Sequence, residues 1–117
     1  MKVILLGDTG QLGQAFINLN ADNTFECYSF NRSNFDIQHL ENFFRRADSI
    51  GADFLINMIA YTDVNRAEEQ NEQCALVNHH FPKRLSKFCK QRNIQLIHIS
   101  TDYVFDGTNT EPYNEID

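Results

Sequence analysis

The sequence is poor in positive charge. Its 117 residues include 10 lysines and arginines against 16 aspartates and glutamates, which gives a formal net charge of −6. Nucleic acids and anionic membrane surfaces attract basic proteins, so we expect neither as a partner. The basic run from Lys83 to Arg92 has the spacing of the outer face of a helix, and we interpret it as a solvated surface.

Cysteine and long apolar runs are also scarce. The three cysteines are odd in number, lie far apart and form no C-x-x-C pair, which argues against a disulfide framework or a zinc site. No apolar run approaches the ~20 residues of a membrane-spanning helix, and no signal peptide fits the first residues. We therefore expect a cytoplasmic protein with no membrane segment and no bound metal.

Glycine is scarce too, yet it is concentrated near the start of the chain. Three of the five glycines, Gly7, Gly10 and Gly13, follow the apolar run Val3–Leu6 at three-residue spacing, and a helical segment (14–19) comes next. Glycine at such positions allows a tight turn after a buried strand. It also lets the backbone approach a pyrophosphate and lets the next helix pack closely on its strand. The pattern therefore predicts a dinucleotide-binding turn, whose anion site is the helix N-terminus.

Strands and helices are predicted to alternate along the rest of the chain. We expect extended segments at 25–30, 35–37, 53–60 and 95–99, and helices at 40–50, 64–70 and 73–92. Asp36 is a candidate cap of the helix at 40–50, and Gly51 is expected to end it. Pro82 is expected to kink or break the helix at 73–92. This order predicts one α/β domain over residues 1–117: a Rossmann-type, doubly wound parallel sheet in three α/β/α layers that stops after the fifth strand region.

Ligands of such sheets bind beyond the carboxyl ends of the strands. Three segments rich in small polar residues are expected to emerge there, Gly7–Gly13, Ala60–Asp63 and Ser100–Tyr103. Their convergence predicts a cofactor cleft at this edge of the sheet.

The second strand ends in Asn31 and Arg32, without the acidic residue that commonly bonds the ribose 2′-hydroxyl of NAD. An arginine suits the 2′-phosphate of NADP through a charge-assisted, bidentate pair. We therefore expect NADPH to be favoured, or both NADPH and NADH to be used. The alternative is that Arg32 is an ordinary solvated surface residue.

Several motifs together resemble the dTDP-4-dehydrorhamnose reductase family of extended short-chain dehydrogenases/reductases. The glycine turn matches G-x-x-G-Q-L-G, residues 35–37 (Phe-Asp-Ile) resemble L-D-I, and residues 57–68 are similar to N-x-A-A-Y-T-x-V-D-x-A-E. Val77-Asn78 matches a helical V-N pair, and residues 100–107 match S-T-D-Y-V-F-D-G. Departures are few: Met58-Ile59 replace smaller residues, and Asn65 replaces an Asp.

The resemblance implies reduction of a dTDP-linked 4-dehydro-6-deoxy sugar to dTDP-L-rhamnose, with NADP or NAD as cofactor. It implies cofactor contacts for Gly7, Thr9, Gly10, Gln11, Leu12, Gly13, Asn31, Arg32, Asp36, Ile37, Ala60, Tyr61, Thr62 and Asn78. It also implies a catalytic role for Thr101 at the substrate carbonyl, and substrate contacts for Thr101, Asp102, Tyr103 and Phe105.

The family's Tyr-x-x-x-Lys motif does not occur in these residues, because Tyr61, Tyr103 and Tyr113 have no lysine four positions later. We therefore expect a cofactor-binding portion that lacks the sugar-binding region and is inactive alone. The alternative is a non-catalytic module, such as the regulatory subunit of methionine adenosyltransferase. An unpaired, apolar sheet edge at 95–99 would favour a homodimer.

Overall fold

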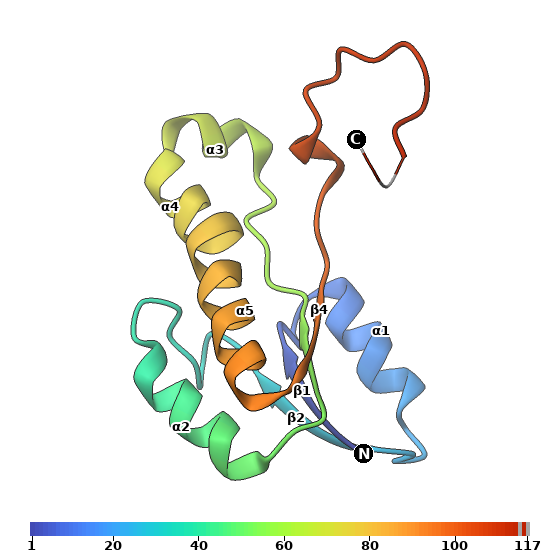
Figure 1. The fold of residues 1–117 in the computed structure, drawn as a ribbon, viewed down its shortest axis with the longest axis vertical. Coiled ribbons are helices and arrows are strands. Elements are labelled where there is room, and N and C mark those ends of the chain that lie inside the picture. Colours follow the sequence, from blue (N-terminus) through green and yellow to red (C-terminus); the bar gives the residue numbers. More distant parts are fainter. Residues whose placement is uncertain (115, 117) are drawn as a thin grey trace.

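A computed structural model describes residues 1–114 and 116, with all of their side chains except that of Asp102. Four parallel strands form one sheet in the order β2-β1-β3-β4 (Figure 1). The strands are β1 (Lys2–Leu6), β2 (Glu26–Phe30), β3 (Phe54–Asn57) and β4 (Gln95–His98). In register, Leu6 of β1 lies between Phe30 and Asn57, so the carboxyl ends of three strands are level.

The helices connect these strands. They are α1 (Gln11–Leu19), α2 (Leu40–Ile50), α3 (Val64–Glu69), α4 (Asn71–Ala75) and α5 (Phe81–Arg92). A π-helical turn, η1 (Leu76–His80), joins α4 to α5, and a short 3₁₀ turn, η2 (Asp102–Val104), follows β4. Gly51 ends α2 in the left-handed conformation at φ 62°, as its position predicts.

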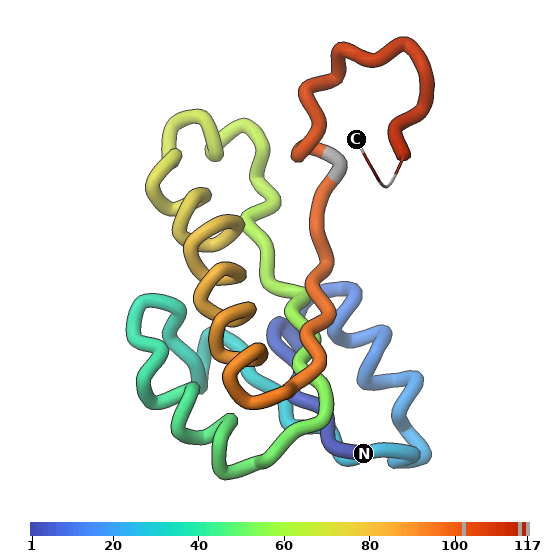
Figure 2. The backbone as a smooth tube through the Cα atoms, in the orientation of Figure 1, coloured from blue at the N-terminus to red at the C-terminus, as the bar shows by residue number. Residues whose placement is uncertain are grey.

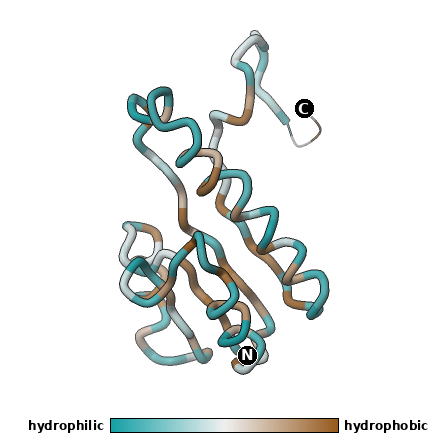
Figure 3. Tube along the Cα trace, turned by 90° about the vertical axis from the view of Figure 1, so that its left-hand side faces the viewer, coloured by the Kyte–Doolittle hydropathy of each residue, from teal (hydrophilic) through white to brown (hydrophobic). Residues whose placement is uncertain are grey.

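The strands are largely hydrophobic along the chain (Figure 3). Apolar side chains pack between the sheet and the helices on both of its faces. On one face Val3, Leu5 and Ile56 pack with Phe16 of α1. On the other face, Ile4, Leu6 and Leu55 pack with side chains of α2 and α5. The alternation of sides along β1 follows from the two-residue period of a strand. The predicted three-layer parallel α/β sheet is confirmed.

The sheet of the described residues has four strands, and the short extended segment expected at 35–37 does not join it. The side chain of Asp36 accepts hydrogen bonds from the Gln38 backbone N–H and from the His39 ring, which bends the chain here. For the same reason Asp36 does not cap α2. The N-cap is His39, and no side chain caps that helix.

The segment 73–92 is not one continuous helix. At η1 the N–H of Phe81 donates to the carbonyl of Leu76, five residues back. Pro82 has no N–H to continue the regular pattern at the start of α5, which explains why the irregularity precedes it. The predicted break at Pro82 is therefore confirmed as a π-helical turn. Its inner face is also confirmed, since Phe81, Leu85 and Phe88 are buried.

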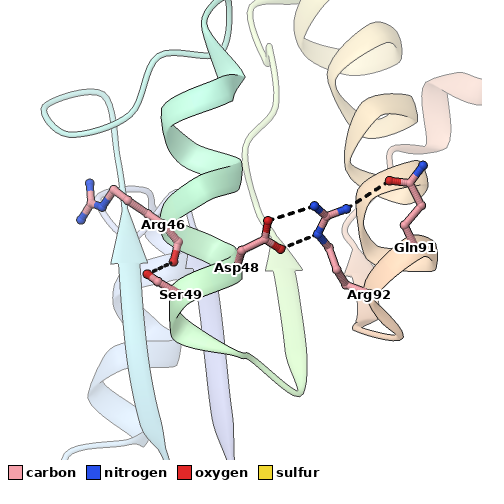
Figure 4. Close-up of polar contacts among 5 residues, drawn as sticks. All are labelled: Arg46, Asp48, Ser49, Gln91 and Arg92. Atoms are coloured by element: carbon pink, nitrogen blue, oxygen red, sulfur yellow. Dashed lines mark hydrogen bonds and ion pairs between the residues drawn. The ribbon is translucent and has the colours of Figure 1, made fainter.

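A polar contact ties the ends of α2 and α5 together (Figure 4). The guanidinium of Arg92 donates to both carboxylate oxygens of Asp48, from Nη2 over 2.9 Å and also from Nε. These hydrogen bonds hold the pKa of Asp48 below its usual range. Arg92 also lies over the Phe88 ring, 4.4 Å from its centroid. This pair orients the helices on the face away from α1.

Candidate functional site

The glycine turn between β1 and α1 requires glycine at two of its positions. Gly7 has φ +91°, and its N–H donates to the carbonyl of Phe30 over 2.9 Å. A Cβ added to Gly13 would lie 2.2 Å from the carbonyl oxygen of Gly7 and 2.8 Å from the Cα of Asp8. Helix α1 therefore packs directly on the turn, as the sequence predicts for the third glycine.

The N-terminus of α1 is exposed to an incoming anion. Gly10 is its N-cap, no side chain caps it, and its first turn has no acidic residue. The first N–H groups of a helix have no partner within the helix, and they lie at the positive end of its dipole. The local structure thus fits a phosphate group.

A cleft of about 710 Å³ opens beside this turn. Such a volume is within the range of small-molecule sites, about 300–1,000 Å³. Most of the predicted cofactor residues line it: Gly7, Thr9, Gly10, Asn31, Arg32, Asp36, Ile37, Ala60 and Tyr61. The segments that follow β1, β2 and β3 therefore converge on one space, whereas the predicted segment Ser100–Tyr103 does not line it.

Side-chain hydrogen bonds build the wall beyond β2. Asn31 accepts from the Ser33 backbone N–H over 2.9 Å, and Asn34 accepts from the Asn31 backbone N–H over 2.9 Å. These bonds fold residues 31–34 into a turn. Arg32 is exposed on it, lines the cleft, and has no ion pair or hydrogen bond within the described residues. The guanidinium is therefore available to an anionic ligand.

The opposite wall is the loop after β3. Asn57 is fully buried, and its side-chain oxygen accepts from the Ile59 N–H over 3.1 Å. Farther along, Asn78 in η1 accepts from the Tyr61 N–H over 2.8 Å and donates to the Tyr61 carbonyl over 3.1 Å. The π-helical turn thus carries the side chain that fixes this loop. Asn78 is exposed and is not among the residues that line the cleft, so its predicted contact with the coenzyme stays a prediction.

One ion pair lies at the rim of the cleft. Asp36 and the Nδ1 of His39 are 2.8 Å apart, and both side chains are more than half exposed. The hydrogen bond to His39 lowers the pKa of Asp36, and the same bond raises the pKa of His39. The pair therefore strengthens as His39 is protonated.

The remaining predicted residues are not among those that line the cleft. Gln11, Leu12 and Gly13 form the first turn of α1, directly after the lining residue Gly10, and Thr62 directly follows Tyr61. The segment after β4 rises away from the sheet (Figure 2), so Thr101, Tyr103 and Phe105 do not line this cleft. The side chain of Asp102 lies outside the described residues. The substrate roles of these four residues stay predictions.

The cleft also has lining residues that sequence reasoning did not assign to it: Phe35, Gln38, Met58, Ile59, Gln73 and Val77. Met58, Ile59 and Phe35 adjoin predicted residues, so their proximity was a usable signal. Val77 reads as an ordinary core position by its helical spacing. Gln73 is 60 or more residues from the glycine turn, and only the three-dimensional arrangement brings it there.

In the described part of the chain, no group of three or more histidine, cysteine, aspartate or glutamate side chains lies close enough together to hold a metal ion. No helix there is both long and apolar enough to cross a membrane.

Comparison with known proteins places the chain in a family. The family model described as "RmlD substrate binding domain" matches residues 1–117. The chain is 33% identical over 117 residues to a dTDP-4-dehydrorhamnose reductase of Aggregatibacter actinomycetemcomitans, covering 99% of this chain and 40% of that protein. It is 34% identical over 116 residues to one of Mycolicibacterium smegmatis, covering 99% of this chain and 35% of that protein.

Solved structures agree with this result. A dTDP-4-dehydrorhamnose reductase from Clostridium acetobutylicum superposes with TM-score 0.92 at 30% identity, covering 100% of this chain and 42% of that one. One from Bacillus anthracis, in complex with NADP, superposes with TM-score 0.90 at 28% identity, covering 99% of this chain and 41% of that one. The chain thus spans about 40% of the length of these relatives. It belongs to the RmlD substrate binding domain family.

Proposed function

We propose that this chain binds NADPH or NADH in the cleft at the carboxyl ends of β1, β2 and β3. The observation that carries the proposal is the glycine turn, where Gly13 leaves room for α1 to pack on Gly7 and the uncapped helix faces the cleft. Backbone N–H groups at such a turn suit a diphosphate. Its residues therefore fit a dinucleotide.

We propose the individual contacts from the family resemblance, supported by the residues that line the cleft. Residues 10–13 would hold the diphosphate, Arg32 would face the adenosine ribose, and Asp36 with Ile37 would border the adenine. Tyr61, held in place by Asn78, would border the part of the coenzyme nearer the reacting end. The bound coenzyme would supply the hydride, and these residues would orient it.

We further propose that the chain is the coenzyme-binding part of a reductase that acts on a dTDP-linked 4-dehydro-6-deoxy sugar. Relatives bearing the name dTDP-4-dehydrorhamnose reductase support this assignment. Proton transfer to the substrate would need a tyrosine and lysine pair that these 117 residues lack. Thr101 would then orient the substrate carbonyl, and we expect no turnover by this chain alone.

Titration of the purified chain with NADPH and NADH, followed by coenzyme fluorescence, tests the proposal. Both coenzymes should bind the wild type. Gly10→Val adds a side chain at the cleft lining and should abolish binding, while its fold is checked by circular dichroism. Arg32→Ala should weaken NADPH by about tenfold or more relative to NADH, because a charge-assisted pair contributes about 1.5–3 kcal/mol.

A matched control is Arg45→Ala, which removes an exposed arginine of α2 that contacts Asn42 and lies outside the cleft. It should leave both affinities unchanged. Failure of the folded wild type to bind either coenzyme would contradict the proposal, as would equal weakening by the two arginine substitutions.

We also propose self-association through β4. This strand is at the edge of the described sheet, and Ile97 and Ile99 are each 42% exposed. An edge strand with apolar side chains can pair with another copy. Light scattering should show a dimer whose fraction rises with concentration, and Ile97→Lys should reduce it. A monomer at every concentration would refute this part.

A further inference from the structure

The carboxylate of Asp8 is an unusual feature of the glycine turn. Its Oδ2 accepts a hydrogen bond from the side-chain nitrogen of Asn31 over 3.2 Å. Its Oδ1 is buried and has no hydrogen-bond partner within the described residues. A buried carboxylate oxygen without a partner is costly, so the position calls for a physical explanation.

Asp8 is placed beside the tip of β2. Asn31 directly follows that strand and lines the cleft together with Arg32, whereas Asp8 lies behind Asn31 and is outside the lining. In parallel α/β sheets the end of the second strand faces the adenosine ribose of a dinucleotide. A negative charge from Asp8 and a positive charge from Arg32 therefore act on the same corner of the cleft.

The charge of Asp8 is also felt by a neighbour inside the fold. Burial raises the pKa of the Cys27 thiol on β2, and the Asp8 carboxylate raises it further. The carboxylate is thus close enough to act on a partly buried group of the neighbouring strand.

NADPH and NADH differ at the ribose 2′-position. A phosphate monoester carries about −1.5 to −2 charges at neutral pH, whereas the 2′-hydroxyl of NADH is neutral and donates a hydrogen bond. The two coenzymes share the diphosphate, so a nearby negative charge affects that group equally in both. Only the 2′-phosphate experiences a repulsion that distinguishes them.

We infer that Asp8 is a specificity-determining residue that opposes the attraction of Arg32 for a 2′-phosphate, so that the site accepts both NADH and NADPH. The inference rests on the proposed coenzyme site. Asp8 acts through its charge and through Asn31, not by touching the coenzyme. Its role differs from that of an acidic residue on the strand tip itself.

The test compares the dissociation constants of NADPH and NADH for the purified chain and for Asp8→Asn. Asparagine has nearly the same size and can still accept from Asn31, so the substitution removes mainly the charge. We expect the ratio of the NADPH constant to the NADH constant to fall about tenfold, which equals 1.4 kcal/mol. Asp22→Asn, at an exposed position outside the cleft, is the matched control and should leave the ratio unchanged.

A second variant keeps the test decisive if Asp8→Asn does not fold. Asn31→Asp adds a negative charge at the same corner and should raise the ratio. If Asp8→Asn or Asn31→Asp folds and its ratio of dissociation constants stays within threefold of the wild-type ratio, the inference is overturned, while the proposed coenzyme site is left intact. Binding of neither coenzyme to the wild type overturns both the inference and the proposed function.

Discussion

Replacing Gly13 by alanine is expected to destabilise the protein, although alanine is the better helix former. Gly13 lies in the first half of α1, where the exchange would gain about 0.5–1 kcal/mol from helix propensity alone. The added Cβ, however, would lie 2.2 Å from the Gly7 carbonyl oxygen, against an ordinary contact of 3.4–4 Å. Both obstacles, the Gly7 carbonyl and the Asp8 Cα, are backbone atoms that no side-chain rotation can move.

The magnitude follows from these opposing effects. Overpacking of a close contact costs about 1–3 kcal/mol and sometimes more. Displacement of α1 would also disturb the hydrogen bond from the Gly10 N–H to the Gly7 carbonyl, now 3.1 Å, at a cost of about 1 kcal/mol. We expect a net loss of about 2 kcal/mol in the free energy of unfolding. With about 2.1 cal/mol/K of unfolding entropy per residue, Tm should fall by about 8 °C.

Urea denaturation followed by circular dichroism measures this loss. Gly10→Ala is the matched control, because its Cβ would lie 3.4 Å from the same oxygen, an ordinary contact. Because Gly10 is the N-cap, where alanine is less favourable than glycine, we expect a loss of no more than about 1 kcal/mol, about half of that expected for Gly13→Ala. A Gly13→Ala protein as stable as the wild type would refute the close packing of α1 on the turn.

Three other measurements test the core and the titrating groups. Leu85 is fully buried, so Leu85→Ala should cost about 2–5 kcal/mol, whereas Leu19→Ala, at an 85% exposed position, should cost little; equal effects would contradict the described core. The pKa of His39, measured by NMR, should exceed its ordinary 6.5 and should fall in Asp36→Asn. Because folding raises this pKa, the stabilisation by the pair is fully present below pH 6.5 and is lost as the pH rises through the pKa of the folded protein. Burial raises the pKa of Cys89 to about 11, so this thiol should resist thiol reagents at pH 8 in the folded protein and react after unfolding; rapid modification of the native state would disprove its burial.

Features set by neighbouring residues were predictable from the sequence. The apolar run of β1 followed by three spaced glycines predicts both a buried strand and a tight turn, and the structure has both. Gly51 after the apolar pattern of α2 predicts a left-handed helix end, which is present. In these cases the determinants lie within about one helical turn of the structure they produce.

Features set by competition between local interactions were harder to predict. Phe35-Asp36-Ile37 has the composition of a short strand, but the Asp36 side chain bonds the backbone two residues later and bends the chain. The interruption before Pro82 was predictable, whereas its form as a π-helical turn depends on how the preceding residues pack. Where a side chain can stabilise either of two local conformations, the surrounding residues decide which conformation forms.

The walls of the cleft depend on contacts between remote segments. The bond from Asn31 to Asp8 spans 23 residues, and no local pattern marks it. Asn78 is predicted from motif resemblance to contact the coenzyme, and the structure shows that it also bonds the backbone of Tyr61, 17 residues away. Sequence could indicate which residues gather near the site, but not which of them line it and which support it.

The central claim is that backbone N–H groups of the glycine turn meet the diphosphate of a dinucleotide. An ¹H–¹⁵N correlation spectrum of the labelled chain, recorded during addition of NADPH, tests it most directly. We predict that the amide signals of residues 10–13 shift most strongly and saturably, with smaller shifts at Arg32 and Tyr61. Unchanged signals for residues 10–13 at saturating NADPH, or changes confined to another face of the sheet, would contradict the claim.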